Sequence, residues 1–226
     1  MTVTKKDLRN MNNRCHKAKL SPRPNRRLAI LLIAGVWAVL PVAGNPAFAG
    51  PATELVEKFH IDLIDVMKKA DATGIEERYK ILHPAVRRTF NMPVMIRIAS
   101  GAVWRAAIND DKNALVKAFT KMSVTTYASR FDGYSGQSFE TLSETPGPKN
   151  SIVVRTRILS PGDKPVKLTY VLREYSGTWQ AIDVILAGGI SELALRHSEY
   201  RAVLKKVGLL GLARVLDKKS DQILGR

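Results

Sequence analysis

Four β-rich segments follow one another closely in the second half of this 226-residue chain, and they restrict the fold more than any other feature. They occupy residues 138–142, 152–159, 166–173 and 179–186. The connections between them hold Pro146-Gly147-Pro148, Ser160-Pro161-Gly162-Asp163 and Tyr175-Ser176-Gly177, all residues typical of tight turns. Because consecutive strands with such short connections pair antiparallel, the sequence predicts a four-stranded antiparallel meander within residues 137–187.

Side chains alternate along these strands so that one face of the predicted sheet is apolar. Successive residues of a strand point to opposite faces. In the second strand this places on one face Ile152, Val154, Thr156 and Ile158, and on the other Val153, Arg155 and Arg157. In the third strand, the same alternation opposes Val166, Leu168, Tyr170 and Leu172 to Lys167, Thr169 and Arg173. A sheet of this kind needs a second layer over its apolar face.

Helical patterns precede the strands. Residues 53–70 carry an apolar stripe, and we expect this helix to start at Thr53 and to stop near Gly74. A shorter helix follows, which Pro84 should end or kink, and residues 85–90 are expected to form another helical turn. Residues 92–108 hold charges only at Arg97 and Arg105, so we expect a helix covered on most of its circumference.

A long helix should then begin near residue 112, after a cap supplied by Asn109, Asp110 and Asp111. Beyond the last strand, the pair Gly188-Gly189 predicts a sharp turn directly into helix 190–207, which Gly208 separates from a helix over about 209–222. The order is helices (50–132), sheet (137–187) and C-terminal helices (190–222). This order predicts an α+β fold in which helices cover one face of the sheet, as in NTF2-like proteins.

The N-terminal 49 residues have the features of a secretory signal peptide. Nine basic residues and one acid, Asp7, precede an uncharged run over 28–44, and Ala47-Phe48-Ala49 forms the A-x-A pattern of a cleavage site. The alternative is a membrane anchor, but this run is shorter than the roughly 20 residues of a spanning helix and Pro41 interrupts it. We therefore expect cleavage after Ala49, export to the periplasm, and one mature domain over 50–226.

Cleavage would change the composition. The only cysteine, Cys15, would be removed, so neither a disulfide nor a thiolate nucleophile would remain. The net charge would fall from +16 to (36 − 9) − (20 − 1) = +8. This charge suits transient contact with anionic lipid headgroups or an acidic partner, although a solvated basic surface explains it equally well. Nucleic acid is not an expected partner, because the basic residues are not concentrated around exposed aromatic residues.

Signals for catalysis are weak. His60, His83 and His197 form no metal-binding motif, and the sequence points to no metal and no cofactor. Asp183 stands out as a carboxylate inside an apolar strand, where we expect it to pair with Arg155 or Arg157 across the sheet. This structural role is favoured over that of a catalytic acid.

Apolar residues exceed what a surface helix and a one-sided sheet require, which leaves two interpretations open. The surplus forms either a filled core or an apolar cavity between sheet and helices that accepts lipid chains. The walls of such a cavity would come from Val154, Ile158, Leu168, Tyr170, Leu172, Ile182 and Val184 on the sheet and from Ile98, Ala102, Val103 and Phe119 on the helices. An interior filled by the protein's own side chains would count against lipid binding.

Several motifs together resemble a known family. Trp179-x-x-x-Asp183-x-x-x-x-Gly188, the serine at 191 and Leu204-x-x-x-Gly208 resemble the C-terminal half of the MlaC or toluene-tolerance auxiliary family. The segments 88–93 (Arg-Thr-Phe-Asn-Met-Pro) and 127–136 are similar to its hopanoid-associated branch, HpnM. The likeness extends over residues 50–226, and the order and spacing of the motifs carry it.

The resemblance implies a periplasmic, non-enzymatic carrier that holds phospholipid acyl chains, or a hopanoid-type lipid, between sheet and helices. It also implies an auxiliary role in an ABC lipid transporter, with exchange of cargo between a membrane-anchored MCE-domain protein and an outer-membrane partner. One alternative is a secreted NTF2-like enzyme that uses Asp183 with His60 or His83. Another is an adaptor that binds only proteins and has a filled core.

Overall fold

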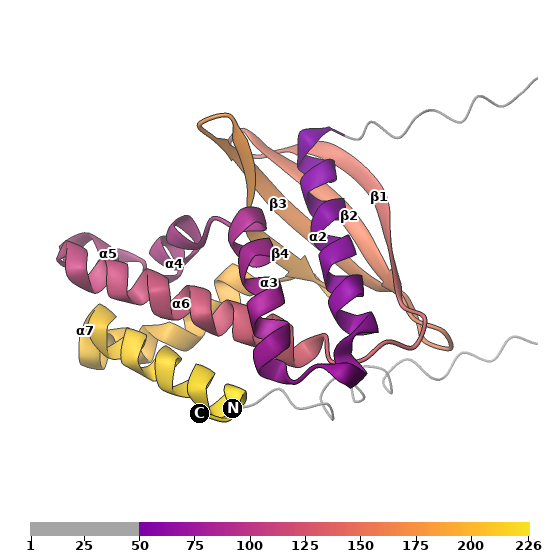
Figure 1. The fold of residues 1–226 in the computed structure, drawn as a ribbon. Coiled ribbons are helices and arrows are strands. Elements are labelled where there is room, and N and C mark those ends of the chain that lie inside the picture. Colours follow the sequence, from indigo (N-terminus) through magenta and orange to yellow (C-terminus); the bar gives the residue numbers. More distant parts are fainter. Residues whose placement is uncertain (1–49) are drawn as a thin grey trace, which may run out of the picture. The chain divides into compact units, whose positions relative to one another are not determined.

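The computed structural model describes residues 50–226, so the signal peptide predicted for residues 1–49 lies outside the described part of the chain. The described residues form a helical layer and one antiparallel sheet (Figure 1). The helices are α2 (Pro51–Lys68), η1 (Ala70–Ala72), α3 (Ile75–Thr89), α4 (Met92–Ser100), α5 (Ala102–Ala106), α6 (Asn109–Arg130) and α7 (Glu192–Leu224). The predicted α+β class is confirmed.

The sheet is a meander of five strands rather than four. Its order is β1 (Ser138–Gly147), β2 (Ser151–Leu159), β3 (Val166–Tyr175), β4 (Thr178–Leu186) and β5 (Ile190–Ser191). The additional strand arises because Gly188 and Gly189 turn the chain back on itself, so that Leu186 pairs with Ile190 before α7 starts. The predicted turn is confirmed, but it closes a hairpin instead of leading directly into a helix.

The two faces of the sheet follow the predicted alternation. Tyr170 pairs with Val154 on one side and with Val184 on the other, and all three are buried. Helix α2 contacts β1, β2 and β4, and α3 and α4 contact β4 (Figure 1). The opposite face carries polar pairs such as Arg157 with Glu140.

The helical turn expected over residues 85–90 is present, but it continues the preceding helix instead of following a break, and residues 92–108 differ from prediction. Pro84 lies inside α3, which continues to Thr89. The proline removes one backbone hydrogen bond, and burial of Ala85 and Val86 in the next turn offsets part of that loss. The predicted single helix 92–108 is instead divided by Gly101, whose φ of 59° and ψ of −133° are closed to most other residues.

Two predicted helix caps are also wrong. Helix α2 begins after Gly50, and the Thr53 hydroxyl lies inside its first turn, where it donates to Glu144 of β1. Helix α6 begins at Asn109 with no side-chain cap, so Asp110 and Asp111 lie in its first turn, where acids interact favourably with the helix dipole. The predicted break in the C-terminal helix is confirmed, because Gly208 has non-helical dihedral angles within α7.

Candidate functional site

The inner face of the sheet contains most of the residues expected to line a cavity. Val154, Leu168, Tyr170, Leu172 and Val184 are buried on this face. Ile158 lies on the same face and is half-buried. Ile182 is also buried, but it is the extra residue where the register between β3 and β4 shifts. The alternation of side chains along the strands was therefore sufficient to identify this surface, apart from the β-bulge at Ile182.

The helical residues expected opposite this surface are mostly elsewhere. Phe119 is buried on α6, but Ile98, Ala102 and Val103 are exposed to solvent. For Ala102 and Val103 the physical reason is the break at Gly101, which ends α4 and makes α5 a separate helix without a single buried residue. Ile98 lies within α4, on a face away from its buried residues. The expectation that residues 92–108 are covered on most of their circumference is therefore wrong.

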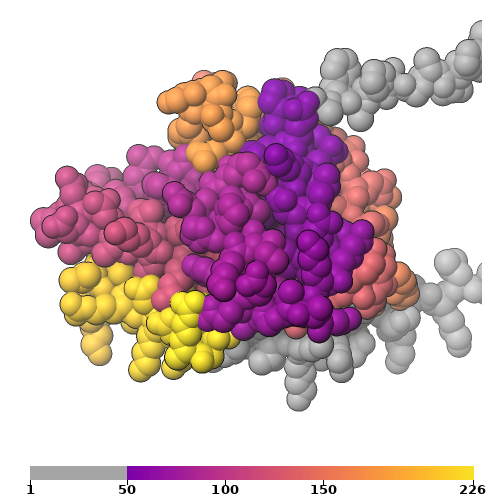
Figure 2. All heavy atoms as spheres, viewed as in Figure 1, coloured from indigo at the N-terminus to yellow at the C-terminus, as the bar shows by residue number. Residues whose placement is uncertain are grey.

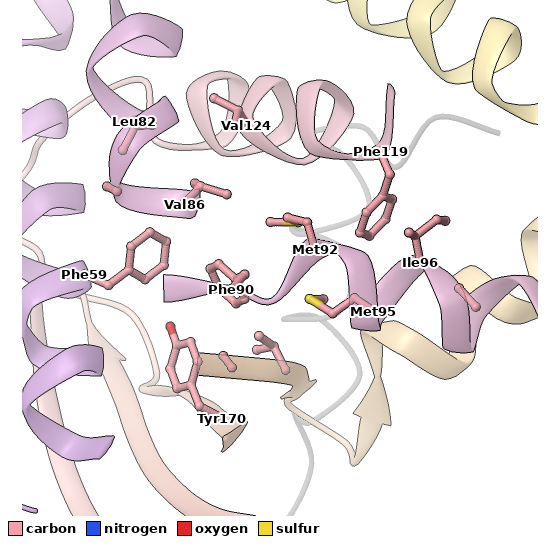
Figure 3. Packing of buried hydrophobic residues seen from close by; sticks show 14 of the residues in the cluster. Phe59, Leu82, Val86, Phe90, Met92, Met95, Ile96, Phe119, Val124 and Tyr170 are labelled. Carbon is pink, nitrogen blue, oxygen red and sulfur yellow. The ribbon is translucent and has the colours of Figure 1, made fainter. Parts of the chain in front are cut away.

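Aromatic side chains from α2, from α6 and from the segment between α3 and α4 cover the inner face instead. Phe59 of α2 meets Phe90 and Tyr127 edge to face, with ring centroids 5.2 Å away in both pairs. Phe90 also packs beside Tyr170, at 6.5 Å between ring centroids (Figure 3). The apolar stripe of residues 53–70 is the one sequence signal that pointed to Phe59. Nothing in the pattern indicated its partners, which are 31 or more residues away along the chain.

A histidine and a tyrosine form a polar pair within this apolar interface. His60 Nε2 lies 3.0 Å from the Tyr170 hydroxyl, and the His60 ring stacks on Phe139 at 4.0 Å between centroids. Burial lowers the pKa of His60 to about 3, because a charged imidazole would be desolvated there. Burial likewise raises the pKa of Tyr170 well above its usual range. Both side chains are thus uncharged at neutral pH.

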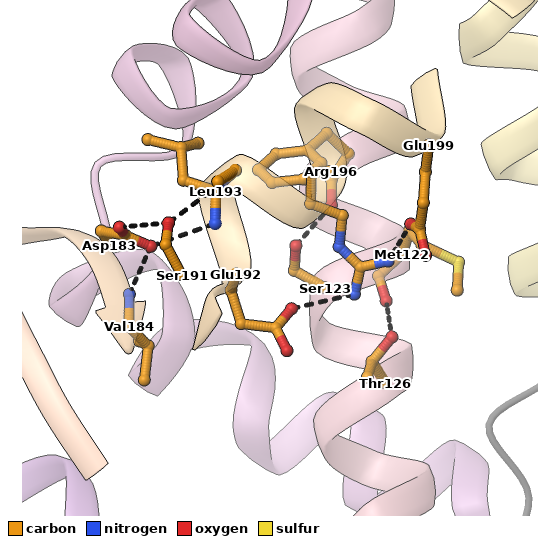
Figure 4. A network of polar contacts seen from close by, with 12 residues as sticks. Met122, Ser123, Thr126, Asp183, Val184, Ser191, Glu192, Leu193, Arg196 and Glu199 are labelled. Atoms are coloured by element: carbon orange, nitrogen blue, oxygen red, sulfur yellow. Dashed lines mark hydrogen bonds and ion pairs between the residues drawn. The ribbon is translucent and has the colours of Figure 1, made fainter. Parts of the chain in front are cut away.

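Asp183 joins the end of the sheet to the start of α7 (Figure 4). Its Oδ1 accepts hydrogen bonds from the backbone N–H groups of Val184 at 2.8 Å and Leu193 at 3.0 Å. Its Oδ2 accepts one from the Ser191 hydroxyl at 2.6 Å, and Ser191 in turn caps α7. The expected pairing with Arg155 or Arg157 is wrong, because these arginines bind Thr145 and Glu140 of β1.

The structure does not bring the residues of the enzyme alternative together. Asp183 is bonded to Ser191 and the backbone, whereas His60 is bonded to Tyr170 and no bond joins it to Asp183. His83 lies on α3 beside Tyr79, and His197 contacts the Ala99 carbonyl oxygen. Within residues 50–226, no three histidine or acidic side chains are grouped as a metal site would require.

Two hollows open at opposite ends of the sheet. The larger, of about 640 Å³, lies at the β1–β2 and β3–β4 turns and is lined by residues that include Lys149, Arg173 and Trp179. The smaller, of about 300 Å³, lies beside Gly188 and Gly189. Neither is located between the inner face and the helices, where Phe59, Leu172 and Tyr170 are almost completely buried. Protein side chains fill the interface that was expected to contain a cavity.

The fold and this apolar interface define a class of α+β proteins in which helices pack on one face of an antiparallel meander. Comparison with family models gives the family within this class: residues 57–218 match the MlaC protein family, and the chain belongs to it. The predicted family is confirmed, whereas assignment to the HpnM branch stays a prediction. A search of curated proteins gives no match.

The fold is similar to a solved structure from Ralstonia solanacearum, a phospholipid-binding protein in complex with a phospholipid. The TM-score is 0.67 and the identity is 19%, with 76% of this chain and 98% of that chain covered. At this identity the likeness concerns the fold. In the part of the chain that the structure describes, no helix has both the length and the apolar character needed to cross a membrane.

Proposed function

We propose that this protein is a periplasmic lipid carrier that binds phospholipid acyl chains between its sheet and its helices. The observation that carries the proposal is membership of the MlaC family over residues 57–218. A fold shared with a protein whose structure contains a phospholipid supports it, as does the apolar inner face of the sheet. The N-terminal sequence pattern supports export to the periplasm.

The filled interface sets a physical condition on this function. Because Phe59, Tyr170 and Leu172 occupy the space in which cargo would lie, acyl chains enter only if the helices move away from the sheet. Burial contributes about 0.8 kcal/mol per methylene, so one sixteen-carbon chain would contribute about 12 kcal/mol toward that opening. The same term opposes release of the lipid into water. Transfer therefore requires contact with a receiving membrane or protein.

The carrier would serve as an auxiliary component of an ABC lipid transporter. In this proposal it takes cargo from one membrane and delivers it to the other, through a membrane-anchored MCE-domain protein and an outer-membrane partner. The segments 88–93 and 127–136 favour the HpnM branch, whose cargo would be a hopanoid-type lipid instead of a phospholipid. The two lipid classes differ in mass and are separable after extraction.

Native mass spectrometry of protein purified from the periplasm tests the proposal. We expect a mass increase equal to one or two lipids, followed by identification of phospholipid or hopanoid after organic extraction. Uptake of a fluorescent phospholipid from vesicles provides a second measurement. Absence of both copurified lipid and uptake would refute the carrier function and would favour the adaptor with a filled core.

A further inference from the structure

Helices α4 and α5, the residue before α6 and the bend of α7 all carry exposed apolar side chains. We define this surface by its apolar residues and call it the basic tip because of the cations described below. The apolar residues are Ile98, Val103, Ile108, Val207 and Leu210, whose exposed fractions lie between 36% and 66%. Helices α4 and α5 both contact α7, and His197 of α7 binds the Ala99 carbonyl oxygen at 3.0 Å. Figures 1 and 2 show these helices side by side at one end of the described domain. Isolated exposed apolar residues are ordinary, but several on neighbouring elements at one end of a domain indicate a contact surface.

The bend of α7 accounts for the exposure of Val207 and Leu210. Gly208 has a φ of 65° and a ψ of −167°, which interrupts the helix between Val207 and Leu209. Leu209 and Leu212 are buried beyond the bend, whereas Val207 and Leu210 face solvent. A regular amphipathic helix would direct its apolar residues to one side. Here the bend leaves apolar residues on the outside as well.

Exposed basic residues accompany the apolar residues in the same segments. Segments 92–108 and 201–216 contain six basic residues and no acid, and all six are exposed: Arg97, Arg105, Arg201, Lys205, Lys206 and Arg214. None of the six forms an ion pair with a carboxylate in residues 50–226. Asp110 and Asp111 follow at the start of α6, so cations still exceed acids by six to two.

We propose that the basic tip docks on the surface of an anionic lipid bilayer. Apolar side chains that enter the headgroup region and lysines or arginines that meet anionic headgroups are the two components of interfacial membrane binding, and both are present here. The unpaired cations are complementary to an anionic lipid surface. The biological purpose of docking rests on the proposed carrier function, because docking would bring the sheet–helix interface to the membrane that gives or receives cargo.

Cosedimentation with vesicles tests the surface. Protein is purified from cells that express the complete chain, and its intact mass records any processing of the N-terminus. Vesicles contain phosphatidylglycerol with phosphatidylethanolamine, or phosphatidylcholine alone. Each basic residue near an anionic surface contributes about fivefold in partitioning. We therefore expect Lys205→Gln/Lys206→Gln to weaken binding to the anionic vesicles about 25-fold, and Val207→Ser/Leu210→Ser to weaken binding to both kinds.

The matched control is Lys218→Gln/Lys219→Gln, which makes the same change of charge at exposed positions on the same helix. It should bind anionic vesicles within twofold of the wild-type protein. Equal loss in this control would show that net charge alone attracts the protein, and would overturn the proposal. Circular dichroism confirms that each variant is folded.

Other outcomes assign the surface to a different occupant and likewise overturn membrane docking. If the tip variants bind vesicles normally but abolish a dimer seen by sedimentation velocity, the surface belongs to a second copy of the chain. If they bind vesicles normally but lose binding to a purified protein partner, it belongs to that protein.

Native mass spectrometry of the same samples separates docking from the carrier function. If the wild-type protein docks through the tip but neither copurifies with lipid nor takes it up, the carrier function fails and docking stands. If the protein copurifies with lipid but the tip variants bind vesicles as well as the wild-type protein does, only docking is overturned.

Discussion

Replacing Asp183 by Ala should destabilise the protein because three hydrogen bonds lose their acceptor at once. The carboxylate accepts from Val184 N, Leu193 N and the Ser191 hydroxyl. Hydrogen bonds to a charged group contribute about 1.5–3 kcal/mol each, and water replaces part of them where the donors are half-exposed. We expect the free energy of unfolding to fall by about 2–4 kcal/mol.

Asp183→Asn separates the geometry of this site from its charge. Both backbone donors bind Oδ1, and the carbonyl oxygen of an asparagine can occupy that position. The new amide group would donate to the Ser191 oxygen, so that only the serine proton loses its acceptor. We therefore expect Asp183→Asn to cost about 1 kcal/mol and to leave lipid binding intact.

Urea denaturation followed by circular dichroism measures both variants, with Asp163→Ala as the control at an exposed turn position. The control should stay within about 0.5 kcal/mol of the wild-type protein. A cost below that for Asp183→Ala would refute the anchoring role. Equal costs for the alanine and asparagine variants would show that charge, not hydrogen-bond geometry, holds β4 to α7.

Three further predictions concern the stability of the fold. The pKa of His60 is about 3 when folded and about 6.5 when unfolded, so its stabilising contribution is complete above pH 6.5 and is lost as the pH falls toward 3. Between these values the free energy of unfolding should decrease by up to about 1.4 kcal/mol per pH unit. His60→Gln should reduce this slope when denaturation is measured across pH. Glu144→Ala should cost about 1–2 kcal/mol by removing the acceptor at the start of α2, whereas Glu174→Ala at an exposed position of the same sheet should be neutral in urea denaturation. Gly208→Ala should lower the free energy of unfolding by about 1–3 kcal/mol, because the dihedral angles of Gly208 are nearly restricted to glycine. Thermal melts measure the change, and Gly74→Ala is the control because Gly74 has a negative φ.

The features predicted correctly from the sequence are those that depend on the repeat of side-chain directions along a single strand or helix. The residues on the inner face of β2 and β3 followed from alternation, because every second side chain of a strand points to the same face of the sheet. The bend at Gly208 was also predicted, since the residue interrupts an otherwise helical pattern. These features depend on residues a few positions apart.

Features that depend on distant parts of the chain could not be predicted. Asp183 binds Ser191 because β5 folds back beside β4, and a strand of two residues leaves no periodic signal. His60 meets Tyr170, 110 residues away, because of how α2 lies on the sheet. The exposure of Val103 likewise followed from the positive φ of Gly101, which the composition of residues 92–108 does not reveal.

Composition could not distinguish a filled interface from a hollow one, because the same apolar side chains serve both. Phe59, Phe90 and Tyr170 close the space between α2 and the sheet when they meet each other, and they would line it if they met acyl chains. The difference is the free energy of separating these layers against the roughly 0.8 kcal/mol gained per buried methylene. Chain length of the lipid therefore becomes the decisive variable. A carrier with this filled interface should bind long-chain lipids and reject short-chain analogues, whose burial cannot offset the cost of opening.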